Sequence, residues 1–134
     1  MQKDLLSRPG MQNATTENEQ RPSVALVVLN WNGRQLLHRY LPALTSLDYP
    51  NYQVVVVDNG SVDGSASFVR KEYPQIKLLD LDENLGYGPA FNEAVPQLDT
   101  DIVVLLNNDV EVPKNWLKKL IAPMRHDPTI GVIG

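Results

Sequence analysis

The stretch that decides the fold is DIVVLLNND, residues 101–109, in which an apolar run ends in two amides and a carboxylate. A run that is apolar at nearly every position is typical of a parallel strand covered on both faces, since neither side then meets water. The abrupt change to Asn107, Asn108 and Asp109 marks the carboxyl end of that strand. Ligands of open α/β sheets bind beyond such ends, so the same stretch indicates where to look for a site.

Three further apolar runs precede it: VALVVL at 24–29, QVVVVD at 53–58 and IKLLDL at 76–81. Apolar residues recur at helical spacing in the segments between and after these runs. They are Leu36, Leu37, Tyr40, Leu41 and Leu44, and then Trp116, Leu117, Leu120 and Ile121. The alternation predicts a Rossmann-like α/β fold, with a mostly parallel, doubly wound sheet and helices on both faces.

Turn residues predict where the helices begin. Asp63, followed by Gly64 and Ser65, favours a helix that runs through Tyr73, and Pro113 suits the first turn of the last helix. The segment NLGYGP, 84–89, contains two spaced glycines, which are weak evidence of a nucleotide-binding loop. It is equally consistent with a simple turn into a helix that begins near its proline.

The 134 residues, 43% of them hydrophobic, fit one domain with an ordinary core. Residues 1–22 are polar and without periodicity, which predicts a disordered tail before a domain at 23–134. The last residues, IGVIG at 130–134, predict the opening of a fifth strand. We therefore expect a domain that is incomplete at its C-terminal end.

Composition excludes several classes of function. The net charge is −4 with scattered basic residues, which argues against a nucleic-acid partner, and the absence of cysteine excludes disulfides and thiolate chemistry. No apolar run approaches the length of a membrane span, and the polar start lacks the apolar part of a signal peptide. The expected location is the cytoplasm, with membrane association left open for a longer form.

Polar residues collect after three of the predicted strands. Any one such cluster is typical of a structural turn, but with a strand order of 3-2-1-4 all three would share one rim. The clusters are Asn30, Trp31, Asn32 and Gly33; Asp58, Asn59, Gly60, Ser61, Val62 and Asp63; and Asn107, Asn108 and Asp109.

Two carboxylates of this rim suit different tasks. Asp58 can accept a hydrogen bond from a base or a sugar hydroxyl, whereas Asp109 is a hard oxygen ligand of the kind that Mg²⁺ or Mn²⁺ uses together with phosphate. Together they suggest a nucleoside diphosphate. The first strand is not followed by G-x-G-x-x-G, and no phosphate-loop motif occurs, which disfavours dinucleotide oxidoreductases and P-loop enzymes.

Four segments together resemble the nucleotide-binding half of the family-two, GT-A-fold glycosyltransferases, in that family's order and spacing. They are LNWNGRQLL at 29–37, DYPNYQVVVVDNGSVDGS at 48–65, NLGYGPAFNEA at 84–94 and DIVVLLNNDVEV at 101–112. The resemblance covers residues 23–134 and is greatest for the branch that includes rhamnosyltransferases of cell-surface polysaccharide.

The resemblance implies roles for individual residues. The D-x-D motif of the family falls on Asn107, Asn108 and Asp109. By this resemblance Asp109 would coordinate the cation. Asn107 would hydrogen-bond a ribose hydroxyl, since an amide is a poorer metal ligand. The remaining nucleotide-binding residues divide by position. Asn30, Asn32 and Asp58 would surround a uracil, thymine or guanine; Asn59, Ser61 and Asp63 would shape the loop; and Asn84, Gly86 and Asn92 would pass near ribose and diphosphate.

The implied activity is an inverting, metal-dependent glycosyl transfer from a UDP-, dTDP- or GDP-linked sugar to a polysaccharide or glycolipid acceptor. The family's catalytic base lies well downstream of D-x-D and is expected beyond Gly134, so this chain should bind the donor without turning it over. A non-catalytic α/β module that binds a nucleotide or a partner is the alternative. A sugar-nucleotide pyrophosphorylase is less favoured, because no glycine-rich basic loop follows the first strand.

Overall fold

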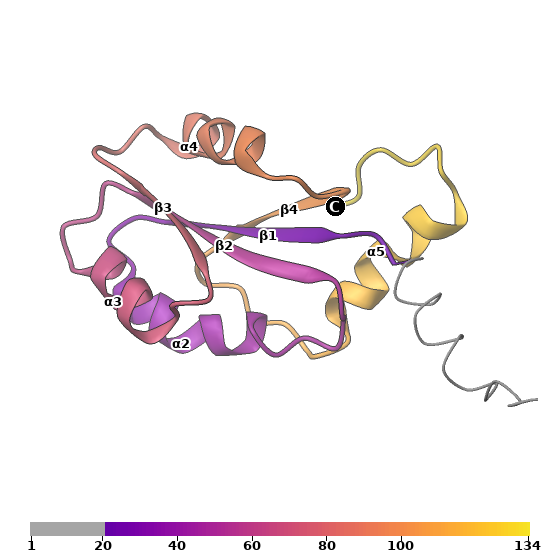
Figure 1. The fold of residues 1–134 in the computed structure, drawn as a ribbon, viewed down its shortest axis with the longest axis horizontal. Coiled ribbons are helices and arrows are strands. Elements are labelled where there is room, and N and C mark those ends of the chain that lie inside the picture. Colours follow the sequence, from indigo (N-terminus) through magenta and orange to yellow (C-terminus); the bar gives the residue numbers. More distant parts are fainter. Residues whose placement is uncertain (1–20) are drawn as a thin grey trace, which may run out of the picture.

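A computed structural model describes residues 21–134, so of the predicted tail only Arg21 and Pro22 lie within the described residues. The chain forms a four-stranded parallel sheet in the order β3-β2-β1-β4, flanked by helices (Figure 1). The elements are β1 (Val24–Asn30), α2 (Arg34–Leu44), β2 (Tyr52–Asn59), α3 (Ser65–Glu72), β3 (Lys77–Leu81), α4 (Tyr87–Ala94), η1 (Val95–Gln97), β4 (Ile102–Asn107) and α5 (Trp116–His126).

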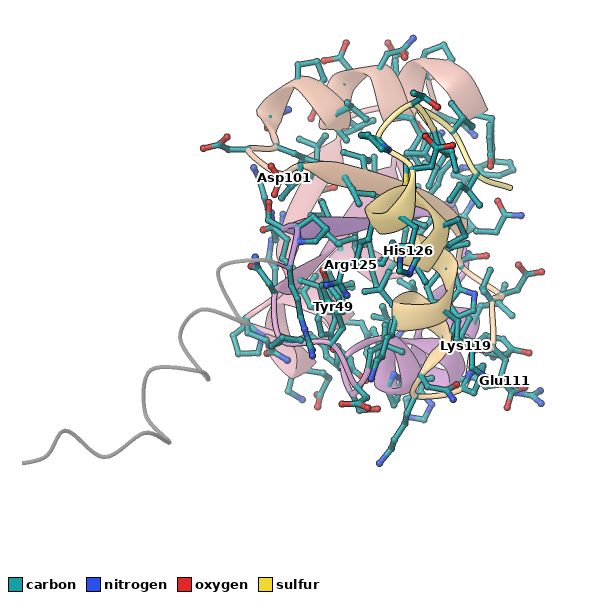
Figure 2. The ribbon with its side chains drawn as sticks, turned by 90° about the vertical axis from the view of Figure 1, so that its right-hand side faces the viewer. Tyr49, Asp101, Glu111, Lys119, Arg125 and His126 are labelled. Atoms are coloured by element: carbon teal, nitrogen blue, oxygen red, sulfur yellow. The ribbon has the colours of Figure 1, made fainter. Side chains whose placement is uncertain are left out.

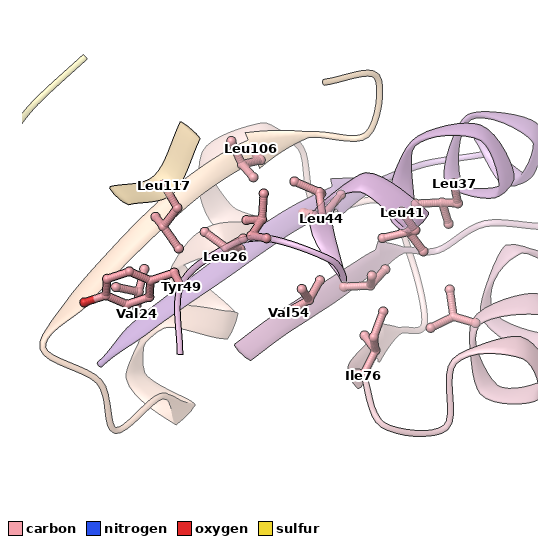
Figure 3. Packing of buried hydrophobic residues seen from close by; sticks show 14 of the residues in the cluster. Val24, Leu26, Leu37, Leu41, Leu44, Tyr49, Val54, Ile76, Leu106 and Leu117 are labelled. Atoms are coloured by element: carbon pink, nitrogen blue, oxygen red, sulfur yellow. The ribbon is translucent and has the colours of Figure 1, made fainter. Parts of the chain in front are cut away.

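The doubly wound α/β fold predicted from the sequence is confirmed, and the strand order is the one that brings the three polar clusters to one rim. Helices α2, α3 and α5 lie on one face of the sheet, and α4 lies on the other (Figure 1). The first face holds the larger core, where Leu37, Leu41 and Leu117 pack against aliphatic side chains of the strands (Figure 3). The second face is smaller and packs around Phe91 of α4.

Side chains of the strands divide between these two faces by the parity of their numbers, because successive residues of a strand point to opposite sides. Val24, Leu26 and Val28 belong to the core beneath α2, whereas Ala25 and Val27 belong to the core beneath α4. The same alternation extends to the carboxyl tips of the strands. It therefore decides which face each polar rim residue lies on.

Only the two central strands are covered on both faces as predicted. Strands β3 and β4 lie at the edges of this sheet and are partly exposed; Leu105 of β4 is 48% exposed. The expectation that all four strands are buried on both sides is wrong for these two, since α4 is too short to cover the outer strands as well as the central ones.

Two local predictions also need correction. Residues 130–134 form no strand; part of this segment lies beside β4 without pairing to it (Figure 1). A strand needs backbone partners, and apolar composition alone does not supply them. Helix α5 begins at Trp116, and Pro113 lies in the preceding turn, where its carbonyl accepts a hydrogen bond from the Trp116 N–H.

Between residues 21 and 134, no helix combines the length and the apolar character that a bilayer span requires.

Candidate functional site

The register of the parallel strands brings the polar clusters together. Asn30 at the end of β1 lies opposite Asp58 at the end of β2, and Leu29 lies opposite Asn107 at the end of β4. Because β1 is central, its neighbours on both sides contribute to one rim. The rim predicted from the sequence is therefore present.

An open cleft of about 400 Å³ lies at this rim, on the α4 side of the sheet. Two aromatic side chains are well exposed there, Trp31 at 56% and Tyr87 at 60%. The residues that line the cleft come from the ends of β1, β2 and β4 and from the start of α4. They are Leu29, Trp31, Asn59, Asn84, Gly86, Tyr87, Asn107, Asn108 and Asp109.

The wall of the cleft next to α4 is held by two asparagines. Asn59 Nδ2 donates to Asn84 Oδ1 at 2.9 Å and to the Gly86 carbonyl at 3.2 Å, while Asn59 Oδ1 accepts from the Leu85 N–H at 2.9 Å. Asn84 Oδ1 also accepts from the Gly86 N–H. These bonds fasten the loop after β3 to the tip of β2, so the cleft wall is fixed before any ligand arrives.

A second network lies on the opposite, α2 side. Asn30 and Asp58 are both fully buried, and Asn30 Nδ2 donates to Asp58 Oδ2 at 2.9 Å. The other oxygen, Asp58 Oδ1, accepts from the Ser61 N–H at 2.9 Å. Asp58 therefore has no exposed surface in this structure with which it could contact a base directly, as the resemblance had implied. The reason is that the even-numbered residues of β2 point toward α2 and α3.

Ser61 and Asp63 make the hydrogen bonds that hold the loop after β2. Ser61 Oγ accepts from the Asn32 N–H at 2.8 Å, and Asp63 accepts from the N–H of Arg34 and from both the N–H and the hydroxyl of Ser65. Partial burial acts to raise the pKa of Asp63, but these hydrogen bonds outweigh it and hold the pKa below its ordinary value. The carboxylate ties the starts of α2 and α3 together.

Asn32 stands in the left-handed region at φ 49°, which asparagine tolerates better than most residues. Its Oδ1 accepts from the Val62 N–H at 2.8 Å. Asn32 thus joins the turn after β1 to the loop after β2.

The turn after β4 carries the candidate metal ligand. Asp109 is exposed and, among residues 21–134, is the one carboxylate that lines the cleft, beside Asn107 and Asn108. In the described part of the chain, no group of three or more acidic, histidine or cysteine side chains could hold a metal by itself. This donor set fits Mg²⁺ or Mn²⁺ only when a ligand supplies further oxygens, which is how Mg²⁺ commonly binds beside phosphates.

The predicted residue Asn92 and the two histidines of the chain can now be placed. Asn92 is exposed on α4 and does not line the cleft. His38 packs against Phe68, and His126 lies with Arg125 at the opposite end of the molecule (Figure 2). Trp31, a member of the cluster after β1, is 56% exposed and is not part of the core. Tyr87 was missed, although an aromatic residue between two glycines in NLGYGP could have indicated it.

A depression of about 440 Å³ between β4 and α5 is lined mainly by aliphatic side chains. It lacks the converging amides of the rim and is not a candidate for polar chemistry.

The sheet order and the polar cleft at the switch point define an α/β nucleotide-binding class of protein. The model of glycosyl transferase family 2 matches residues 23–134, and the chain belongs to this family, whose GT-A fold it shares.

Two curated relatives and one solved structure illustrate the similarity. The chain is 32% identical over 119 residues to the beta-monoglucosyldiacylglycerol synthase of Synechocystis sp., covering 84% of this chain and 25% of that protein. It is 28% identical over 120 residues to the N-acetylglucosaminyl-diphospho-decaprenol L-rhamnosyltransferase of Mycobacterium tuberculosis, covering 81% and 39% respectively.

The mannosyltransferase PcManGT from Pyrobaculum calidifontis, solved with GDP-Man and Mn²⁺, superposes with a TM-score of 0.73. Its sequence is 32% identical, and the match covers 83% of this chain and 34% of that one. The chain thus spans between a quarter and two fifths of the length of these relatives.

Proposed function

We propose that the cleft binds the nucleoside diphosphate part of a sugar donor, together with Mg²⁺ or Mn²⁺, for an inverting glycosyl transfer. The observation that carries the proposal is the cleft itself: an exposed indole, a set of fixed amides and one carboxylate converge at the switch point of the sheet. The resemblance to a mannosyltransferase solved with GDP-Man and Mn²⁺ supports this assignment.

The lining residues suit the parts of a nucleotide. Trp31 offers a flat, exposed face on which a base can stack. Asn59 and Asn84 hold the wall near the ribose, and Asn107 offers an amide to a sugar hydroxyl. Uracil, thymine and guanine all remain candidate bases.

The charge of the cleft favours a metal-dependent binding mode. Among the described residues that line it, none is lysine or arginine, so no side chain there neutralises a diphosphate. Asp109 would hold the cation, with the phosphates supplying other ligands. When bound, such a cation stabilises the negative charge that develops on the departing nucleoside diphosphate.

The acceptor, either a polysaccharide or a glycolipid, and the carboxylate base that deprotonates it belong to the whole enzyme. We propose that the base lies beyond Gly134 in the full-length protein and that this chain alone does not turn over. The names of the two curated relatives are consistent with a glycolipid or lipid-linked acceptor. A non-catalytic binding module would show the same donor affinity, so only activity of a longer form separates the two.

Isothermal titration calorimetry with UDP, dTDP and GDP, each with Mn²⁺ or with EDTA, tests the proposal. At least one nucleotide should bind with Mn²⁺ and lose most of its affinity in EDTA. Asp109→Ala should weaken the free energy of nucleotide binding in the presence of Mn²⁺ by about 1.5–3 kcal/mol, the size of a contact to a charged group. Glu111→Gln, an exposed acid two residues away that does not line the cleft, serves as control and should bind normally.

Absence of binding by all three nucleotides with either cation would contradict the proposed function.

A further inference from the structure

Asn30 links three separate parts of the rim through a single buried side chain. Its Nδ2 donates to Asp58 Oδ2 at 2.9 Å and approaches Ser61 Oγ at 3.3 Å, and its Oδ1 accepts from Asn108 Nδ2 at 2.8 Å. Both ends of the amide are therefore used. The tips of β1 and β2 and the turn after β4 are joined by this one group.

The direction of these hydrogen bonds follows from the chemistry of Asp58. An ionised carboxylate only accepts, and Asp58 is flanked by two donors, Asn30 Nδ2 and the Ser61 N–H. Asn30 must therefore turn its NH₂ group toward Asp58 and its oxygen toward Asn108. Asn108 must then donate a hydrogen bond to that oxygen from its own NH₂ group, since two facing oxygens would repel each other.

The end of this chain of bonds lies at the cleft. Asn108 lines the cleft next to Asp109 and is only partly buried. Its NH₂ group is committed to Asn30, and within residues 21–134 its Oδ1 accepts no hydrogen bond. The oxygen is thus the half of this amide that remains available to a ligand.

We propose that Asp58 and Asn30 are positioning residues that hold Asn108 with its side-chain carbonyl oxygen available to the cleft. They do so through a relay of two hydrogen bonds that donate in the same direction, from Asn108 to Asn30 and from Asn30 to Asp58. That oxygen accepts an O–H of the bound nucleotide–cation complex, so the inference rests on the proposed function for the identity of the ligand. Asp58 acts through Asn30 and Asn108, and it does not touch the base.

Exchanging the two buried residues tests the relay. Asp58→Asn alone offers one oxygen to two donors, so a bond is lost or the relay reverses and presents NH₂ to the cleft. Asn30→Asp alone sets two carboxylates where the present pair is 2.9 Å apart. The double variant Asn30→Asp/Asp58→Asn keeps every donor opposite an acceptor, keeps the net charge and leaves Asn108 in its present orientation.

Each single variant should lower the affinity for the nucleoside diphosphate with Mn²⁺ by roughly tenfold or more, and the double variant should recover to within about threefold of the parent chain. Gln75→Glu, an exposed amide-to-acid change in the loop before β3, should leave affinity unchanged. Direct contact between Asp58 and the base predicts the opposite, because the double variant still lacks the acid at position 58.

A double variant that folds but binds as weakly as the weaker single variant would overturn the relay, as would one that fails to fold. Unaltered affinity in Asp58→Asn would overturn it too. Thermal unfolding separates this inference from the proposed function: if the parent chain binds no nucleotide, the proposed function fails. The relay then still requires both single variants to melt earlier and the double variant to regain the parent's midpoint.

Discussion

At the scale of single residues, the role of each rim side chain depends on the face to which its strand position points. Odd-numbered Asn59 and Asn107 line the cleft, whereas even-numbered Asn30 and Asp58 are buried on the α2 side. Sequence neighbours such as Asp58 and Asn59 therefore have different tasks: one belongs to the internal framework and the other to the cleft wall.

Trp31 should report on ligand binding directly. If a base stacks on its exposed indole, Trp31→Ala should weaken nucleotide binding by about 1–3 kcal/mol, with little effect on stability. Nucleotide addition should quench the fluorescence of Trp31 while Trp116, half-buried in α5, stays unchanged. Quenching that persists in Trp31→Phe and disappears in Trp116→Phe would contradict this assignment.

Gly33 is required by close packing. A Cβ atom added there would lie 2.2 Å from Asn108 Nδ2 and 2.6 Å from Asn30 Oδ1, the two atoms of the relay's last hydrogen bond. Gly33→Ala should therefore weaken both nucleotide binding and thermal stability. Gly88→Ala, with nothing within 4 Å of the added carbon and inside α4, should stabilise by up to about 1 kcal/mol. Equal effects of the two changes would refute this explanation.

At the scale of elements, one loop side chain fixes two helices. Neither α2 nor α3 has a side-chain N-cap of its own, and Asp63 supplies hydrogen-bond acceptors to the first turn of both. This arrangement couples the turn after β1 to the loop after β2. The hydrogen bonds of Asp63, which are not part of the relay, therefore also hold the α2 side of the rim together.

Asp63→Asn should lower the free energy of unfolding by about 1 kcal/mol at pH 7, the usual net value of one hydrogen bond, because the amide keeps only one of the two acceptor oxygens. Because the folded pKa of Asp63 is below its ordinary value, its stabilisation is complete above the unfolded pKa of about 4. It is lost as the pH falls through the folded pKa. Unfolding midpoints of parent and variant should therefore converge in acid. Asp48→Asn, an exposed acid elsewhere, serves as control; a pH-independent difference for Asp63→Asn would contradict the prediction.

The elements themselves were largely predictable, because hydrophobic periodicity and turn residues act locally. The four strands and the alternation with helices follow from runs such as QVVVVD. The failures concern long-range partners. Residues 130–134 have strand composition but form no ladder here, and β4 proved to be an edge although its sequence resembles that of a central strand.

For the site, the sequence identified the residues of the rim but not the hydrogen bonds between them. The clusters after β1, β2 and β4 were placed together correctly by the strand order. That Asn30 bonds Asp58 and Asn108 depends on register across three strands, which no local pattern encodes. The exposure of Trp31 and Tyr87 likewise depends on tertiary packing, which no local pattern encodes.

At the scale of the whole molecule, the outer edge of β4 exposes apolar side chains. Within the described residues, no strand pairs with that edge, and Leu105 and Val132 are 48% and 89% exposed. Exposed edges favour association of identical chains. The mass measured by light scattering should rise with concentration, and Leu105→Lys should suppress the rise. A parent chain that stays monomeric at every concentration would contradict this expectation.

The central claim is that a nucleoside diphosphate and a divalent cation bind together at the carboxyl rim. Paramagnetic broadening by Mn²⁺ in NMR spectra locates the cation most directly. With nucleotide present, broadening should centre on the amides of Asn107–Asp109 and the indole of Trp31, and Mn²⁺ alone should produce little of it. Residues at the opposite end, Tyr49 and Arg125, should remain sharp (Figure 2). Broadening that centres on that opposite end, or that does not depend on the nucleotide, would contradict the account.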